Sequence, residues 1–329
     1  MSGANLMDRK ATYTRAQFIV IISVAVAFIL ILLAKDYLLG ALFAVVIWSY
    51  LLSMELLTTR FLSGPTTRNE ALDDEKWLKV QTTRNGFPVN GRLRLQEGKA
   101  PLMICLHGWS SSTARMGPLM RDFHRMGMHT MALEYRNHGD GGDTREWTSM
   151  KVVDDLDQLM ADCIDRDSVS EVYLYGHSMG AFIIFAASRI CDNSWWNKLV
   201  KGAILESPMT SYPEVFRRMT TSLSFLRIPL KRRLLRAWKS IHPETILFKW
   251  EDSQLPAWGV PNCPLLVLQA PNDEVLSPLH FELLIDILEG RLGVESHIVE
   301  GLTHGKSAVD ENRDALIESW LKKRLTLHS

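Results

Sequence analysis

The sequence has few cysteines and no excess of either charge. Among its 329 residues only four are cysteine, and Lys+Arg and Asp+Glu both number 37. The cysteines lie far apart, without a C-x-x-C pair or zinc-like cysteine–histidine spacing, and H-E-x-x-H is absent. We therefore expect buried free thiols, a reducing compartment and no metal. The balanced charge argues against a nucleic-acid partner.

Hydrophobic residues make up 47% of the chain and gather near its start. Residues 18–34 carry no charge, Lys35 and Asp36 interrupt the run, and residues 37–57 are again apolar except for Glu55. A membrane-spanning helix needs about 20 residues, so each run is near the lower limit and the two together are too long for one span. The pattern predicts a transmembrane helical hairpin that turns at the two interrupting charges.

Two alternatives to the hairpin fit less well. A cleaved signal peptide requires a small-residue cleavage site that this sequence lacks, and an interfacial second helix requires a polar face that residues 37–57 do not have. Basic residues flank both ends of the hairpin: Arg9, Lys10, Arg15, Arg60 and Arg68. Because positive flanks stay on the cytoplasmic side, we predict a multi-pass membrane protein with both ends in the cytoplasm.

Composition divides the chain into four segments. We predict a tail over residues 1–17, the hairpin over 18–57, a polar linker over 58–75 and a large domain over 76–329. In the domain, short apolar strand patterns alternate with helical patterns. Strands are expected at 76–83, 92–96, 102–106, 130–135, 172–176, 202–206, 265–270 and 296–301, and helices at 116–126, 148–165, 179–191, 278–289 and 310–325. This alternation predicts a mostly parallel central sheet with helices on both faces, opened by an antiparallel pair.

One interval is too long for a simple crossover. Between the strands expected at 202–206 and 265–270 lie nearly sixty residues with helical patterns of their own, so we predict an inserted helical cap at about 208–262. Its stretch 213–240 holds eight basic residues and one acid. A solvated helix face is the ordinary interpretation of such a run, and contact with anionic lipid head groups is the alternative.

The segment YLYGHSMG at 173–180 places a serine between two glycines where a strand gives way to a helix. Gly176-His177-Ser178-Met179-Gly180 matches G-x-S-x-G, and the strand–turn–helix context is the one that a nucleophile elbow requires. The glycines allow a tight turn that lifts Ser178 above the carboxyl edge of the sheet, where ligands bind in such folds. Ser178 is the predicted nucleophile.

A serine hydroxyl needs a general base, and the base needs a group to orient it. Asp273 follows the strand pattern at 265–270, and His304 follows the last one. The order Ser178, Asp273, His304 is the order expected for an elbow serine. Glu206 also ends a strand and is the alternative acid.

Two backbone N–H groups are candidates for holding the developing oxyanion: those of Trp109, in the loop after the strand at 102–106, and of Met179. His107 is expected to support that loop. Asp140 and Asp143, beside His138, are expected to be solvated acids in a glycine-rich turn.

The domain resembles the α/β-hydrolases, most of all the branch of monoacylglycerol-lipase-like and serine-aminopeptidase-like enzymes. The matching segments are HGW at 107–109, YRNHGDGG at 135–142, GHSMG at 176–180 and the Asp273 and His304 loops. In the second of these, Asn137 replaces a common glycine. The resemblance implies hydrolysis of an ester, thioester or amide without a cofactor.

With the anchor, these features favour a membrane-bound serine esterase or lipase acting on a lipid-like acyl ester. A serine aminopeptidase-like peptidase is the alternative enzyme, although the cap has few acids to receive a substrate amino terminus. A non-catalytic membrane scaffold of the same fold is the third possibility, and the intact Ser178, Asp273 and His304 set argues against it. Substrate-binding residues and oligomeric state are left open.

Overall fold

The computed structural model describes residues 4–305 and 308–325. They form two compact units. Among the described residues, the first unit comprises residues 4–64, 143–147 and 220–250, and the second comprises residues 65–142, 148–219, 251–305 and 308–325.

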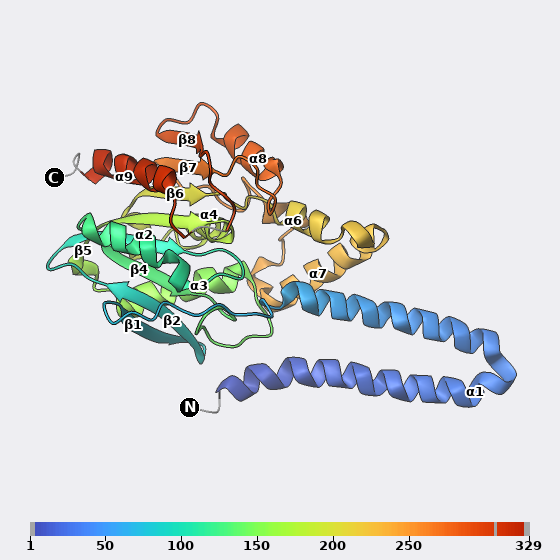
Figure 1. Cartoon of the computed structure of the whole chain (residues 1–329). Helices are drawn as coiled ribbons and strands as arrows, with labels where there is room; N and C mark the ends of the chain where they lie inside the picture. The colour runs from blue at the N-terminus through green and yellow to red at the C-terminus, as the bar shows by residue number, and fades with distance from the viewer. Residues whose placement is uncertain (1–3, 306–307, 326–329) are drawn as a thin grey trace. The chain divides into compact units, whose positions relative to one another are not determined.

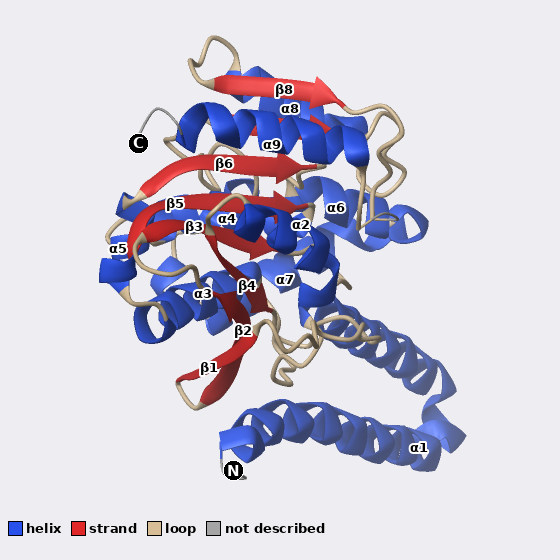
Figure 2. Cartoon of the chain, turned by 60° about the vertical axis from the view of Figure 1, so that its left-hand side comes forward, coloured by secondary structure: helices blue, strands red, loops and turns tan. Residues whose placement is uncertain are grey.

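The second unit is built on one eight-stranded sheet with the order β1-β2-β4-β3-β5-β6-β7-β8 (Figures 1 and 2). The strands are β1 (Leu78–Arg84), β2 (Phe87–Arg94), β3 (Ala100–Leu106), β4 (His129–Glu134), β5 (Val169–His177), β6 (Val200–Glu206), β7 (Leu265–Gln269) and β8 (Val294–Ile298). Strands β4, β3, β5, β6, β7 and β8 pair in parallel, whereas β2 is antiparallel to both β1 and β4. The mostly parallel sheet predicted from the sequence is confirmed.

Helices cover this sheet on both faces, because each buried strand alternates its side chains between two apolar layers. The main ones are α2 (Thr113–Arg125), α3 (Ser149–Cys163), α4 (Met179–Ile190), α8 (Pro278–Leu288) and α9 (Glu311–Leu325), with the short α5 (Trp195–Lys198) and the 3-10 turn η1 (Arg166–Ser168). On one face, side chains of α2 and α9 such as Phe123 and Trp320 pack on Met103, Tyr173 and Ile204 of the strands.

Element boundaries follow the predicted ones closely, with one clear exception in β2. This strand begins at Phe87, earlier than the expected residue 92, although Pro88 disfavours a strand. The tight turn at Asn85-Gly86, with φ of +48° and +78°, returns the chain at once and pairs Thr83 with Pro88. Pairing with β1 therefore overrides local propensity.

The first unit contains the helix α1 (Ala4–Leu62), whose ribbon turns back partway along its length in Figure 1. Within it, Gly40–Leu62 is long and apolar enough to cross a membrane. Among the described residues this is one candidate span, by length and composition only, and the second span expected from the sequence is not established there. The predicted tail over 1–17 is helical from Ala4, and the predicted linker over 58–75 is helical up to Leu62.

The interval between β6 and β7 is helical, but it does not form one body. Its elements are α6 (Tyr212–Met219), η2 (Thr221–Leu226), α7 (Arg227–Ile241), η3 (Pro243–Thr245) and η4 (Trp250–Ser253). Residues 220–250 belong to the first unit, where α7 packs against α1 and Arg233 forms an ion pair with Glu55. The remainder belongs to the unit that holds the sheet.

Candidate active site

Ser178 stands at the junction between β5 and α4 in a backbone conformation that few residues adopt. Its φ and ψ are +53° and −112°. Such strain persists only where the surroundings impose it. The glycines on either side are required by contact: a Cβ on Gly176 would lie 2.6 Å from the nitrogen of Ala181, and one on Gly180 would lie 2.0 Å from the carbonyl oxygen of Leu106. The local sequence thus produces the sharp turn expected of a nucleophile elbow.

The structure brings Ser178, His304 and Asp273 together. Oγ of Ser178 lies 3.0 Å from Nε2 of His304, and Nδ1 of His304 lies 2.7 Å from Oδ2 of Asp273. The His304 and Asp273 side chains are only 7% and 3% exposed. The three residues follow β5, β8 and β7, whose carboxyl ends meet at one edge of the sheet. This arrangement can take a proton from the serine and hold the imidazole in one orientation.

Asp273 is held as an anion. Burial raises its pKa, but the hydrogen bond with His304 and those from the backbone N–H groups of Leu276 and Val275 outweigh it, so the net pKa lies below its usual value. The two backbone donors both reach Oδ1, at 2.8 and 3.0 Å, which leaves Oδ2 for the histidine.

The loop that carries Asp273 is braced by α6. Glu214 accepts a hydrogen bond from the Ser277 hydroxyl at 3.0 Å, and Arg218 donates to the carbonyl oxygen of Glu274 at 3.0 Å. These contacts hold the part of the loop that follows the carboxylate.

Glu206, the alternative acid, is committed elsewhere. The residue is 1% exposed, and its carboxylate accepts a hydrogen bond from the Tyr175 hydroxyl and forms an ion pair with Arg313 at 3.2 Å. Its backbone oxygen accepts the N–H of Ser178 at 2.9 Å. Glu206 therefore supports the elbow from beneath, whereas the carboxylate against His304 belongs to Asp273.

Arg313 was not singled out from the sequence, although a signal existed. It lies four residues before Ile317 on the buried face of α9, together with Trp320 and Leu321. A charged residue on an apolar helical face indicates a buried partner. That partner is Glu206.

His177 is a second residue that the motif did not single out. It is 4% exposed, and its ring lies 5.0 Å from the ring of His304, centroid to centroid. Burial, reinforced by the charges of His304, Arg115 and Arg313, lowers its pKa well below the usual value. His177 is therefore neutral, and its Nε2 lies 3.9 Å from the Glu206 carboxylate.

The loop after β3 lies against the elbow. A Cβ on Gly108 would be 3.4 Å from Cβ of Ser178 and 2.7 Å from Nδ1 of His177, so only glycine fits this close approach. Trp109 follows directly, 42% exposed. Met179 occupies the first turn of α4, where backbone N–H groups lack helical acceptors and favour negative charge. Met179 is next to Ser178 in the chain and Gly108, the residue before Trp109, approaches it, while the role of the two N–H groups as oxyanion donors stays a prediction.

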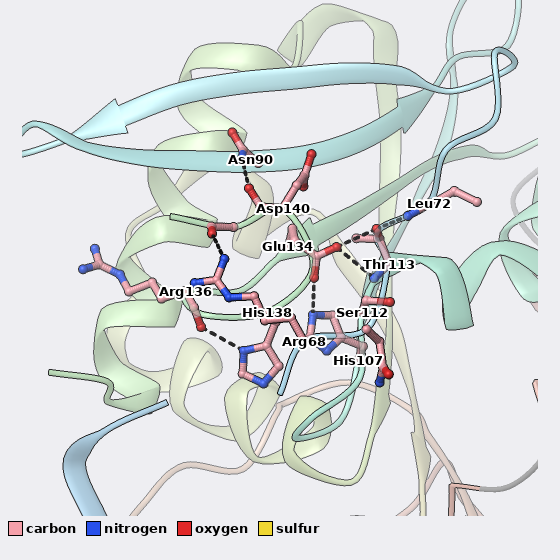
Figure 3. A network of polar contacts seen from close by, with 12 residues as sticks. Arg68, Leu72, Asn90, His107, Ser112, Thr113, Glu134, Arg136, His138 and Asp140 are labelled. Carbon is pink, nitrogen blue, oxygen red and sulfur yellow. Dashed lines mark hydrogen bonds and ion pairs between the residues drawn. The ribbon is translucent and has the colours of Figure 1, made fainter. Parts of the chain in front are cut away.

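Asp140 is not the solvated acid expected from the sequence, because it belongs to a polar network behind this loop (Figure 3). Asp140 is tied to Arg92 at 2.9 Å and to Lys79 at 2.5 Å, and these bonds outweigh burial and lower its pKa. Asn137 has φ of +60°, which explains why glycine is common in this slot and why asparagine is tolerated.

His138, in the same network, is a neutral acceptor. Its Nδ1 lies 2.8 Å from the carbonyl oxygen of Arg136 and therefore carries the proton, so its Nε2 accepts the N–H of Ser110 at 3.2 Å. Burial and the nearby charge of His107 lower the pKa of His138 to about 3. His107 itself lies 2.9 Å from the Gly108 carbonyl oxygen through Nδ1 and faces Glu134 through Nε2, in the supporting role expected of it.

Among the described residues, the cysteines, histidines and acids do not gather into a metal-binding group. Within residues 4–305 and 308–325, no group of three or more His, Cys, Asp or Glu side chains could hold an ion. All four cysteines are free, and burial raises the pKa of Cys191 and of Cys263 to about 12.

Three solved structures illustrate the likeness of this chain to known proteins. The Pyrococcus furiosus esterase Pf2001 matches with a TM-score of 0.58 and 17% identity, over 80% of this chain and 97% of that one. Mouse alpha/beta hydrolase domain-containing protein 10 matches with a TM-score of 0.53 and 15% identity, over 77% and 100%. Est1E from Butyrivibrio proteoclasticus, with ferulic acid bound, matches with a TM-score of 0.52 and 15% identity, over 75% and 98%.

At the level of sequence, residues 98–254 match the family model described as serine aminopeptidase. Curated proteins include no significant sequence match. The matched residues run from β3 through the elbow serine into the insertion. Together with the eight-stranded sheet and the three structural likenesses, this match establishes that the chain has the α/β-hydrolase fold.

Proposed function

We propose that this chain is a membrane-anchored serine hydrolase that cleaves a carboxylic ester of a hydrophobic, lipid-like acyl substrate through an acyl-enzyme on Ser178. The contact chain from Oγ of Ser178 to His304 and on to Asp273, at 3.0 and 2.7 Å, carries the proposal. The esterases among the structural likenesses agree with it in fold.

In the proposed reaction, His304 takes the hydroxyl proton as Ser178 attacks the ester carbonyl carbon. Asp273 keeps Nδ1 of His304 protonated and stabilises the imidazolium. The backbone N–H groups of Met179 and Trp109 hold the oxyanion. His304 then protonates the departing alcohol. Water, deprotonated by the same imidazole, attacks the acyl-enzyme and releases the carboxylic acid.

A second candidate is a peptidase, and the match of residues 98–254 to the serine aminopeptidase model favours it. The same serine chemistry serves both reactions, so the substrate decides between them. Purified protein assayed with p-nitrophenyl esters of increasing chain length, and in parallel with amino-acid p-nitroanilides, separates the two. Turnover confined to the anilides would favour the peptidase.

The membrane part of the proposal comprises two spans, both ends in the cytoplasm, and an insertion that acts as a cap and meets anionic lipid. Support comes from α1, with its candidate span at Gly40–Leu62, and from α7, which packs against α1. Residues 220–250 expose Phe225 at 77% and Ile228 at 67%, and Arg232 is exposed beside them in the sequence. Apolar tips among basic side chains are typical of interfacial surfaces.

The nucleophile is tested with a fluorophosphonate probe on the full chain. Ser178→Ala is expected to abolish labelling and to lower ester hydrolysis to background, because the attacking oxygen is gone. Ser188→Ala is the matched control, since Ser188 lies in the same helix α4 and its hydroxyl donates to the Phe185 carbonyl oxygen at 2.8 Å. Hydrolysis that survives in Ser178→Ala, with the protein folded, would contradict the assignment.

A further inference from the structure

The segment Arg68–Leu72, here called the strap, follows α1 in the sequence and was expected to be a polar linker. It is instead bound to the loops around the candidate site. Arg68 donates to the carbonyl oxygen of Gly141 at 2.9 Å, and Asn69 donates to that of Ser110. The buried hydroxyl of Ser112 donates to the carbonyl oxygen of Glu70.

The last residue of the strap, Leu72, is buried, and both its N–H and its carbonyl oxygen are hydrogen-bonded. Leu72 is 8% exposed, its N–H donates to Oγ1 of Thr113 at 3.0 Å, and its carbonyl oxygen accepts from Nε of Arg92 at 2.6 Å. Thr113 is fully buried at the start of α2. A backbone held from both sides at a buried position is an anchor, because losing either partner leaves an unsatisfied polar group.

Thr113, which accepts the N–H of Leu72, also donates hydrogen bonds to Glu134, as Figure 3 shows. Its hydroxyl donates to Oε2 of Glu134 at 2.7 Å, and its N–H donates to the same oxygen at 3.1 Å. The other carboxylate oxygen lies 3.2 Å from Nε2 of His107. Nδ1 of His107 lies 2.9 Å from the carbonyl oxygen of Gly108, the residue next to Trp109.

Ser110, on the other side of Trp109, is held by the strap directly. Its carbonyl oxygen accepts from Asn69 and its N–H donates to His138, while its own φ is +56°. A serine in that conformation is strained and keeps it only when its neighbours impose it. The residues on both sides of the predicted oxyanion donor are therefore fixed by one network.

We propose that the strap is a positioning element of the oxyanion loop, residues 107–111: Thr113 and Asn69 transmit its position to the peptide that presents the N–H of Trp109. This inference rests on the proposed function, since it assigns an oxyanion to that N–H. The contacts of the strap described above run to loop and helix-start residues and not to Ser178, His304 or Asp273, so its loss should affect stabilisation of the tetrahedral state more than binding of the ester.

The test uses an isosteric pair of variants in the full chain. Thr113→Val keeps the volume of the side chain but removes the hydroxyl that joins Leu72 to Glu134, whereas Thr113→Ser keeps that hydroxyl. Loss of one oxyanion donor lowers kcat by about 10²–10³-fold, so a displaced donor is expected to lower it by about tenfold or more. Thr113→Val should show that loss with KM changed less than about twofold, and Thr113→Ser should restore kcat.

A tetrahedral mimic separates positioning from mere stability. The dissociation constant of phenylboronic acid, which forms a tetrahedral adduct on serine, should rise in Thr113→Val by about the factor lost in kcat. A lower melting temperature with kcat per folded molecule and boronate affinity both unchanged would show a purely structural contact and overturn the inference.

The strap itself is tested by Asn69→Ala, with Thr67→Ala as the neighbouring exposed control. Both residues are exposed, so both variants should fold. Asn69→Ala is expected to lower kcat several-fold and Thr67→Ala to leave it unchanged. Equal kcat values in the two variants would overturn the strap's role even if Thr113→Val failed to fold. Absent probe labelling of the unaltered protein would instead refute the proposed function.

Discussion

The identity of the acid in the proposed triad can be tested by separating activity from stability. Asp273→Asn removes one negative charge in the candidate site, and Glu206→Gln removes one beneath it. We expect the first to abolish most activity in a stable protein. We expect the second to destabilise a protein that is still active.

The effect of Asp273→Asn follows from the different hydrogen-bond partners of the two carboxylate oxygens. Oδ1 accepts the N–H groups of Val275 and Leu276, and an asparagine oxygen can replace it there. The amide nitrogen then faces Nδ1 of His304, which must become an acceptor, so the proton moves to Nε2 and no longer leaves a lone pair for Ser178. The wrong tautomer costs about 10⁴-fold in kcat, or about 5 kcal/mol, whereas stability should fall by only about 1 kcal/mol.

Glu206→Gln should behave in the opposite way. It leaves Arg313, 1% exposed, without its buried counter-charge, although Asp314 still pairs with Arg313 at 2.7 Å. Breaking a buried ion pair costs about 3–5 kcal/mol, and the remaining partner places this case near about 3 kcal/mol. We expect kcat within about threefold of the unaltered protein, since Asp273 still orients His304.

The assays are kcat on a soluble p-nitrophenyl ester and the free energy of unfolding in urea. Both variants are measured beside the unaltered full chain under the same detergent. A larger loss of kcat in Glu206→Gln than in Asp273→Asn, without a loss of stability, would refute the reasoning and place the acid after β6.

Three further predictions concern pH, packing and topology. The buried neutral histidines should make the free energy of unfolding rise with pH. Their pKa values in the folded protein lie below the usual 6.5, at about 3 for His138, at about 4 for His280 and well below 6.5 for His177. Below about pH 6.5 the unfolded chain therefore binds more protons than the folded chain. The free energy of unfolding should be about 4 kcal/mol lower at pH 5.5 than at about pH 7 on account of these three histidines. Urea unfolding at the two pH values measures this difference, and equal values at the two would contradict the prediction. Gly180→Ala should destabilise the domain by about 3 kcal/mol and remove activity, because its Cβ would meet the Leu106 carbonyl oxygen at 2.0 Å, and a melting temperature equal to that of the unaltered protein would exclude this clash. A cysteine at Thr67 should resist an impermeant maleimide in intact cells and react after permeabilisation, as expected when the domain faces the cytoplasm; labelling of intact cells would reverse the topology.

Local sequence determined the elbow and the placement of its partners. The strand, the glycine–serine–glycine turn and the apolar helix are adjacent in the chain, and their patterns depend on residues no further apart than one element. Asp273 and His304 could be placed because each follows a strand pattern, and parallel strands end at the same edge of the sheet. Periodicity and motif spacing were sufficient for this part.

The choice between Asp273 and Glu206 required the tertiary structure. Glu206 ends one strand and Asp273 lies just after another, so the sequence left both as candidate acids. Only the folded chain shows that Arg313, more than a hundred residues after Glu206, occupies that carboxylate, while His304 meets Asp273. Long-range pairing of charges leaves no periodic signal, because neither partner's neighbours in the chain report it.

The contacts of the strap could not be predicted from the sequence either, because most of them involve backbone groups. Its composition is polar, which correctly indicates exposed side chains at Arg68, Asn69 and Glu70, and which made it resemble a linker. Its attachment runs largely through main-chain groups, as where Glu70 and Leu72 meet Ser112, Thr113 and Arg92. Nearly every residue type carries the same N–H and C=O groups, so side-chain composition cannot reveal which of them are bonded. Burial of the apolar elements was therefore determined by the sequence pattern, whereas the hydrogen bonds that connect the strap to the oxyanion loop were decided only when distant segments met.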